Sequence, residues 1–266
     1  MRLCLLIFSG WVFSCQLLSA REFNYDFEFQ VIHWTQKKLD QLGRVRGGEA
    51  RVLRLPLELK YASEDGMKQF YCMEDTLSEL QVYQSDEPLV IFQSKQAYSG
   101  SSDESQEKMA FARPKISEGQ GRWLILLVER PDQKVRSVVY DISRSVLKKD
   151  SMRLVNLTPL PLRLDVGGQK IEVESSSARD LSTSFYKTRS LKIRAAQFHE
   201  PSERWKLKLS RQVSKVGPIR KIAFFYQTNF LRAGQLDSLI VDLDVKPAEV
   251  DLKELRLLRE EELRGY

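Results

Sequence analysis

The chain has 266 residues, 42% of them hydrophobic and 29% charged, and its 42 Lys and Arg against 36 Asp and Glu give a formal net charge of +6. This length fits one large domain or two small ones, and the hydrophobic fraction supports a packed core, which excludes wholesale disorder. After residue 20 no apolar run of about 18 residues occurs, which excludes a multi-pass membrane protein. The 2 His and 3 Cys are too few for a His/Cys metal cluster.

The first twenty residues have the composition of a secretory signal. Arg2 supplies a positive start, residues 3–13 are almost wholly apolar, and residues 19–20 are small. This order predicts cleavage after residue 20 and export to the periplasm or the extracellular space. Two alternatives stay open: an uncleaved N-terminal anchor, and a lipoprotein signal that would place a lipid on Cys15.

Cleavage at this site would leave Cys72 as the single cysteine and a net charge of +5. An exported chain with one cysteine has no internal disulfide, so its core alone must stabilise it. Cys72 lies between Tyr71 and Met73, without a neighbouring base. This context predicts a small buried hydrophobic residue rather than a thiol nucleophile.

Apolar and polar residues alternate at period two through most of the mature chain, which predicts half-buried strands. The alternating segments are residues 23–31, 53–59, 160–166, 171–173, 191–193 and 205–209. Two solid apolar runs, residues 123–128 and 222–226, predict central strands. Turns rich in Gly, Asp and Ser separate these segments. The expected fold class is therefore all-β, with two antiparallel β-sandwich (Ig-like) domains and a C-terminal helix.

A polar link at residues 147–151 divides the strand-rich sequence into two parts. We expect an N-terminal sandwich over residues 21–147 and a second one over residues 151–246. No short internal repeat of the kind that builds solenoids or propellers is visible. Residues 247–266 carry leucines at roughly helical spacing, which predicts a C-terminal helix that either docks on the protein or binds a partner.

The segment MRLVNLTPLPLRLDVGGQKIEVESSSA, residues 152–178, combines an apolar strand, an alternating strand, a Gly turn and a further strand. It resembles the Ig-like module of exported bacterial proteins of the Verrucomicrobia and Planctomycetes type. That module is similar to the one in the periplasmic accessory protein of alginate O-acetylation. The resemblance covers about a tenth of the chain. It implies an Ig-like fold and, as an alternative function, an accessory role in exopolysaccharide modification.

Asn156 stands in an otherwise apolar strand of this segment. Its short amide can hydrogen-bond neighbouring backbone and fix a strand edge or bulge, so we expect a structural role. With Leu157 and Thr158 it also forms a glycosylation sequon. Occupancy is not expected, because the site lies in a strand and the chain has the character of a bacterial exported protein.

The sequence carries no recognisable catalytic motif: it has no G-x-S-x-G elbow, P-loop, G-x-G-x-x-G or H-E-x-x-H. His33 and His199 stand in contexts typical of structural or surface histidines, and paired acids such as Asp86 and Glu87 fall in predicted turns. We therefore expect no cofactor, no metal and no enzymatic activity. An enzyme with an unrecognised carboxylate site stays an alternative.

The most distinctive electrostatic feature is residues 187–221, where eleven bases and two acids give a local excess of +9. Bases alternate with apolar residues here, which predicts that Trp205, Leu207 and Leu209 enter the core and leave a basic sheet face in solvent. The six bases expected to bind a partner are Lys192, Arg194, Arg204, Lys206, Lys208 and Arg211.

Such a face would attract an anionic polysaccharide, an envelope protein, or lipid headgroups in peripheral contact with a membrane. Export makes nucleic acid the least expected partner. Two alternatives stay open: the bases protect a sheet edge from aggregation, or they pair with the acidic sequence of residues 237–266, whose net charge is −4. The leading hypothesis is a non-enzymatic exported protein that binds or scaffolds a cell-envelope component.

Overall fold

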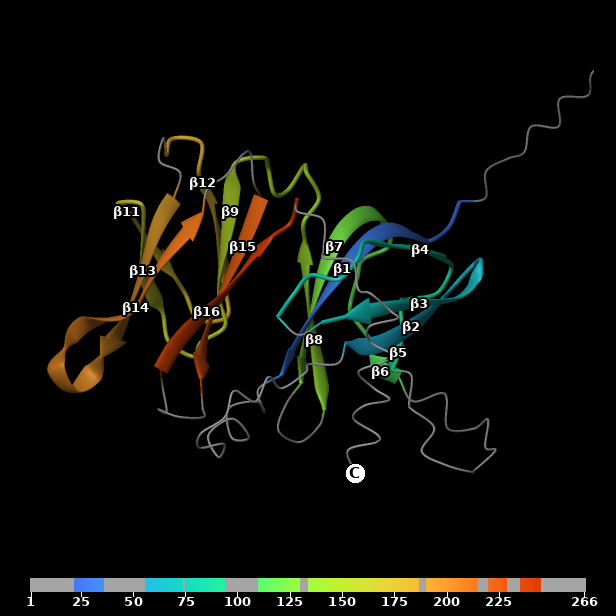
Figure 1. The fold of residues 1–266 in the computed structure, drawn as a ribbon, viewed down its shortest axis with the longest axis horizontal. Coiled ribbons are helices and arrows are strands. Elements are labelled where there is room, and N and C mark those ends of the chain that lie inside the picture. Colours follow the sequence, from blue (N-terminus) through green and yellow to red (C-terminus); the bar gives the residue numbers. More distant parts are fainter. Residues whose placement is uncertain are drawn as a thin grey trace, which may run out of the picture.

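The structure, a computed structural model, describes residues 22–35, 56–73, 75–93, 110–129, 134–186, 190–214, 220–228 and 235–244. The expected signal at residues 1–20 and the expected helix at residues 247–266 lie outside these ranges. Within them the chain forms sixteen β-strands in four four-stranded sheets, so the all-β fold class is confirmed (Figure 1). No helix in this part of the chain is long and apolar enough to cross a membrane.

The first eight strands form two sheets. Sheet A has the order β4-β1-β7-β8, and sheet B has the order β3-β2-β5-β6. The bounds of these strands are β1 Tyr25–Thr35, β2 Leu57–Ser63, β3 Gly66–Cys72, β4 Gln81–Ser85, β5 Ile91–Gln93, β6 Ala110–Ala112, β7 Gly119–Glu129 and β8 Val135–Asp141.

The last eight strands form the other two sheets. Sheet C has the order β12-β9-β15-β16, and sheet D has the order β11-β10-β13-β14. The bounds are β9 Ser151–Asn156, β10 Leu162–Val166, β11 Gln169–Val173, β12 Ala178–Ser182, β13 Ser190–His199, β14 Arg204–Ser214, β15 Arg220–Thr228 and β16 Gln235–Asp242, with the 3-10 helix η2 Glu200–Ser202 between β13 and β14. The predicted link at residues 147–151 falls between the two sets of strands.

The two sets of strands repeat one topology. Adding eight to each strand number in sheets A and B reproduces the orders of sheets C and D. The directions repeat as well, because β1 with β7 and β9 with β15 are parallel while the other paired strands are antiparallel. The sheets are thus mainly antiparallel, and each of the two that contain a parallel pair holds it at its centre. The described chain is a duplicated eight-stranded unit.

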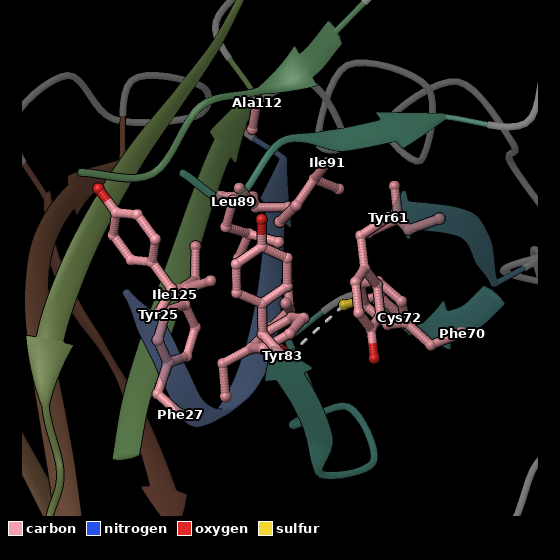
Figure 2. Packing of buried hydrophobic residues seen from close by; sticks show 14 residues of the cluster. Tyr25, Phe27, Tyr61, Phe70, Cys72, Tyr83, Leu89, Ile91, Ala112 and Ile125 are labelled. Atoms are coloured by element: carbon pink, nitrogen blue, oxygen red, sulfur yellow. Dashed lines mark hydrogen bonds between the residues drawn. The ribbon is translucent and has the colours of Figure 1, made fainter. Parts of the chain in front are cut away.

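Two hydrophobic clusters fill the two sandwiches. The first lies between sheets A and B, and the second between sheets C and D. Figure 2 shows the first cluster, where Tyr61, Phe70 and Cys72 of sheet B lie with Phe27 and Tyr83 of sheet A. In β2 and β3 of sheet B, buried residues alternate with more exposed ones, as expected for a sheet with one buried face.

A third cluster joins sheet A to sheet C, so the four sheets stack in the order B, A, C, D (Figure 1). In β15, Phe224 belongs to this cluster while its neighbour Phe225 belongs to the second one. In β7, Leu124 faces sheet C and Ile125 faces sheet B. The solid apolar runs are therefore strands buried on both faces, which confirms their prediction as central strands.

The link between the two sandwiches is part of their contact. Leu147 is buried and belongs to the third cluster. Beside it, Arg153 Nη1 donates to the carbonyl oxygen of Asp141 at 2.7 Å, and Arg220 Nη1 donates to that of Ile142 at 2.7 Å. The two sandwiches pack directly on each other rather than hanging on an exposed tether.

The structural role predicted for Asn156 is confirmed. Its Nδ2 donates to the carbonyl oxygens of Leu160, Val173 and Glu174 at 2.8, 3.0 and 3.1 Å, and its Oδ1 accepts from the backbone N–H and the hydroxyl of Thr158. The side chain is fully buried. The sequon is therefore closed to a glycan in the folded protein.

The prediction for Cys72 is also confirmed. Its side chain is buried in the first cluster, and Sγ lies 3.6 Å from the carbonyl oxygen of Val31. Burial raises the pKa of the thiol to about 12. Cys72 behaves as a small hydrophobic residue.

Candidate binding surface on strands β13 and β14

The hairpin of β13 and β14 extends past the strand that supports it. Strand β10 pairs with β13 only between Ile193 and Gln197, so the chain beyond Gln197 pairs only within the hairpin. Helix η2 and Glu203, which has a positive φ of 47°, form its turn. We name residues 198–208 the hairpin arm; it lies at the end of the molecule opposite sheet B (Figure 1).

A β-bulge divides β14 at Lys208. Leu207 pairs with Ala196 and Leu209 pairs with Ala195, so Lys208 is an extra residue in the ladder. One extra residue reverses the alternation on one side of the bulge relative to the other. Leu209 packs against the second cluster, as predicted. In the hairpin arm, beyond the bulge, the inward and outward positions of β14 are exchanged. The prediction that Trp205 and Leu207 enter the core is therefore wrong.

Trp205 and Leu207 lie on the outer face of sheet D instead of in the core. Trp205 pairs with Phe198, whose side chain is 38% exposed, and Leu207 is 61% exposed. The Phe198 and Trp205 rings meet edge to face with centroids 5.7 Å apart. The guanidinium carbon of Arg163 in β10 lies 4.1 Å from the centre of the Trp205 ring. We name Phe198, Trp205 and Leu207 the Trp205 patch.

The six predicted bases do not share one face. Lys192 and Arg194 lie on the outer face as predicted, between the buried Leu191 and Ile193. Arg194 Nη1 lies 3.9 Å from the carboxylate of Asp165.

Arg204 and Lys206 lie on the opposite side of the hairpin, because their cross-strand partners are His199 and the buried Gln197. Both side chains are exposed, since the arm extends beyond the paired part of β10. Lys208 stands in the bulge and is also exposed.

Arg211 lies on the inner side of β14 and ties sheet D to sheet C. It donates to the carbonyl oxygen of Ser238 at 2.6 Å and to the carboxylate of Asp237 at 2.8 Å. These charge-assisted hydrogen bonds are a structural contact, so Arg211 does not belong to the predicted basic face.

Acidic residues after position 236 pair with the basic segment, as one of the alternatives predicted. Asp237 pairs with Arg211, Asp242 with Lys221, and Asp244 with Arg220. With the contact between Arg194 and Asp165, four of the eight bases that the structure describes in residues 187–221 face a carboxylate outside that segment. The excess of positive charge is therefore smaller than the sequence count indicates.

Four of the predicted bases remain available to a partner. Lys192, Arg204, Lys206 and Lys208 have neither a hydrogen bond nor an ion pair within the described part of the chain, and all four are exposed. Three of them belong to the hairpin arm. Together with the Trp205 patch, they make this hairpin the candidate binding surface.

The other candidate groups lie elsewhere. His33 is buried, with Nε2 3.6 Å from the carboxylate of Glu129, and His199 Nδ1 lies 2.8 Å from the hydroxyl of Ser202. Asp86 and Glu87 are exposed after β4. In the ranges that the structure describes, no three His, Cys, Asp or Glu side chains are grouped so that they could hold a metal ion.

Sequence reasoning missed the Trp205 patch. The segment from Trp205 to Leu209 alternates without a break, and nothing in that pattern reveals the extra residue at Lys208. The composition of the hairpin could have indicated a binding surface, because large apolar residues and bases occur together beside a Glu-Pro turn.

Comparison with protein-family models finds no family that matches this chain, and comparison with the curated proteins finds no matching relative. A function therefore has to be argued from the geometry and charge of this surface.

Proposed function

We propose that this is an exported, non-enzymatic binding protein whose contact surface is the outer face of sheet D with the hairpin arm. Its partner is a polyanionic component of the cell envelope. The observation that supports this proposal is the set of exposed bases at Lys192, Arg204, Lys206 and Lys208, which have no hydrogen bond or ion pair to the residues that the structure describes. Unpaired bases on one surface attract a negatively charged partner over distances of about a Debye length.

Edge protection explains only part of this surface. Lys206 and Lys208 lie on β14, an edge strand, where lysines and a bulge hinder unwanted strand pairing. Lys192 lies on β13, which is paired on both sides and needs no such protection. The exposed Leu207 is also not explained by edge protection, because an apolar side chain on an edge strand promotes association rather than preventing it.

The charge balance of the whole surface favours an anionic partner. The charged side chains that the structure describes on it are seven bases and three acids: Arg163, Lys170, Lys192, Arg194, Arg204, Lys206 and Lys208 against Asp165, Glu172 and Glu203. Arg163 donates to Glu172 at 3.0 Å, and Asp165 lies near Arg194, so the unpaired excess concentrates on the hairpin.

Retention on an anionic polysaccharide column at low salt tests the proposal. A Lys206→Glu/Lys208→Glu double variant should elute at clearly lower salt than the unmodified protein. The matched control is Lys115→Glu/Lys149→Glu, which changes the net charge equally at exposed positions outside the hairpin. Equal elution of the two double variants, or no retention of the unmodified protein at low salt, would overturn the proposal.

A further inference from the structure

We infer that the polyanionic partner is the surface of an anionic lipid bilayer, which the outer side of the hairpin arm contacts. This inference rests on the proposed function and assigns its partner. It is carried by the Trp205 patch, because the bases alone do not distinguish a bilayer from any other polyanion. The patch places a Trp, a Phe and a Leu on the outer face of the hairpin, the face on which Lys192 and Arg194 are also exposed.

The exposed apolar area of the patch suits the headgroup region of a bilayer. Leu207 is 61% and Phe198 38% exposed, while Trp205 is half-buried between Phe198 and Arg163. Elements that lie in a membrane interface combine Trp, Phe and Leu with surrounding Lys and Arg. Aliphatic and aromatic groups enter the acyl boundary there, and long basic side chains remain with the phosphates.

The orientation of the hairpin supports a side-on contact. Glu203 lies exposed at the turn, so a contact made by the tip would press its carboxylate against anionic headgroups. Trp205 and Leu207 instead lie along the outer face of β14, the face that also carries Lys192 and Arg194 on β13. A bilayer lying along this face meets the apolar patch and two bases together.

A sugar polymer fits the patch less well. Stacking on a sugar needs an open aromatic face, and Arg163 covers one face of the Trp205 ring at 4.1 Å. Leu207, the most exposed residue of the patch, has no polar atom to offer a sugar hydroxyl. The anionic bilayer therefore accounts for the apolar and the basic residues of the surface at once.

Co-sedimentation with vesicles tests the inference. The purified full chain should bind phosphatidylcholine vesicles that contain phosphatidylglycerol and should not bind vesicles of phosphatidylcholine alone. Because each base near such a surface contributes about fivefold in affinity, Lys192→Glu/Arg194→Glu, which reverses the two bases of the outer face, should weaken binding by about 25-fold or more. Leu207→Ser should weaken it by about tenfold without changing the charge. Lys115→Glu/Lys149→Glu should change it much less than either.

A quenching measurement reports the patch directly. Brominated acyl chains should quench part of the tryptophan fluorescence on binding, and Trp205→Phe should abolish that part while the protein still binds. Binding to a soluble anionic polysaccharide without binding to vesicles would overturn the lipid assignment and leave the proposed function standing. Binding to neither would overturn both. Vesicle binding that Leu207→Ser leaves unchanged would also overturn the inference. Urea unfolding of each variant checks that these exposed substitutions leave the fold intact.

Discussion

Arg122 in β7 and Arg220 in β15 occupy equivalent positions in the two repeated units, and each strand sits in the A–C contact. The carbonyl oxygen of Arg122 accepts from Ile142 N–H at 2.8 Å, and that of Arg220 accepts from Leu243 N–H at 2.9 Å. Burial is the main cause that lowers the pKa of Arg122, and the positive charge of Arg220 lowers it further.

The equivalent strands β7 and β15 both pack in the cluster between the equivalent sheets A and C, as an isologous contact would place them. The contact between sheets A and C thus resembles a dimer interface enclosed within one chain. The like charges are offset by different carboxylates: Arg220 donates to Asp244 at 2.7 Å, and Arg122 Nε lies 3.9 Å from the carboxylate of Glu28 while its Nη2 donates to Gln30 at 3.0 Å. The equivalent positions have therefore diverged in their hydrogen bonding.

The A–C contact should be as important to stability as the core of either sandwich. Phe224 and Phe225 are adjacent in β15 and almost fully buried, and they face the A–C cluster and the C–D cluster respectively. Phe224→Ala and Phe225→Ala should each lower the free energy of unfolding by about 3–5 kcal/mol, because each leaves a cavity in a packed core. Urea unfolding followed by fluorescence and circular dichroism measures both values.

The same pair of variants tests whether the halves unfold together. A single transition that coincides in both probes is expected for both variants, since the three clusters are continuous through the four sheets. A Phe224→Ala protein as stable as the unmodified one would show that the A–C contact contributes little, and Phe225→Ala serves as the matched control.

Stability should fall in acid partly through Asp244. Burial alone would raise the pKa of this carboxyl, but hydrogen bonds from the Arg220 side chain and backbone, with the Arg220 charge, hold the pKa below its usual 3.8. The unfolded chain therefore binds this proton more readily than the folded protein. The stabilisation is present above about pH 4 and is lost as the pH falls through the lower, folded-state pKa.

Comparison with Asp244→Asn isolates this contribution. The difference in free energy of unfolding between the unmodified protein and Asp244→Asn should be largest near neutral pH and should shrink below about pH 4. Urea midpoints measured across this range provide the test. A difference that stays constant down to strong acid would show that Asp244 has an ordinary pKa in the folded protein.

The positions of many strands could be predicted from the sequence, but the way in which the four sheets stack could not. Period-two alternation located β1 and β10, and the solid apolar runs located β7 and β15. The third cluster was not predictable, because a run buried on both faces says nothing about which sheet covers it. The repeat was missed for a similar reason: SVVYD at residues 137–141 and SLIVD at residues 238–242 share a pattern that any strand of this kind would show.

Part of the candidate surface could be predicted from the sequence, for physical reasons that differ by residue. Lys192 and Arg194 follow an undisturbed alternation, so their exposure was predicted correctly. Lys208 causes a bulge that reverses the face of Trp205 and Leu207, and bulges leave no mark in a binary pattern. Arg211 bonds to Asp237, a partner on another sheet that no local pattern identifies.

Asn156 should be among the least tolerant polar positions of the protein. Its amide N–H groups face the carbonyl oxygens of Leu160, Val173 and Glu174. Asn156→Ala leaves these oxygens without their donor, which should lower the free energy of unfolding by more than about 3 kcal/mol in total. Asn156→Asp at neutral pH should cost at least as much, because it places a carboxylate against three carbonyl oxygens.

Urea unfolding of both Asn156 variants gives the comparison. Ser177→Ala provides the control, since its hydroxyl makes a single exposed hydrogen bond to the carbonyl oxygen of Glu174 in the same loop. Asn156 variants no less stable than this control would mean that the amide network adds nothing to the fold.

Cys72 should be chemically silent until the protein unfolds. Cys72 is 1% exposed, and burial raises the pKa of its thiol to about 12. At pH 8 a reagent therefore cannot reach the sulfur, and almost none of it is in the reactive thiolate form. A chain carrying Cys4→Ser and Cys15→Ser isolates this thiol whether or not the first twenty residues are removed. An aromatic disulfide reagent should label the Cys72 thiol in concentrated urea but not in buffer. At intermediate urea concentrations the labelling rate should follow the fraction of unfolded protein. Rapid stoichiometric labelling of the folded protein would contradict the burial of Cys72 between sheets A and B.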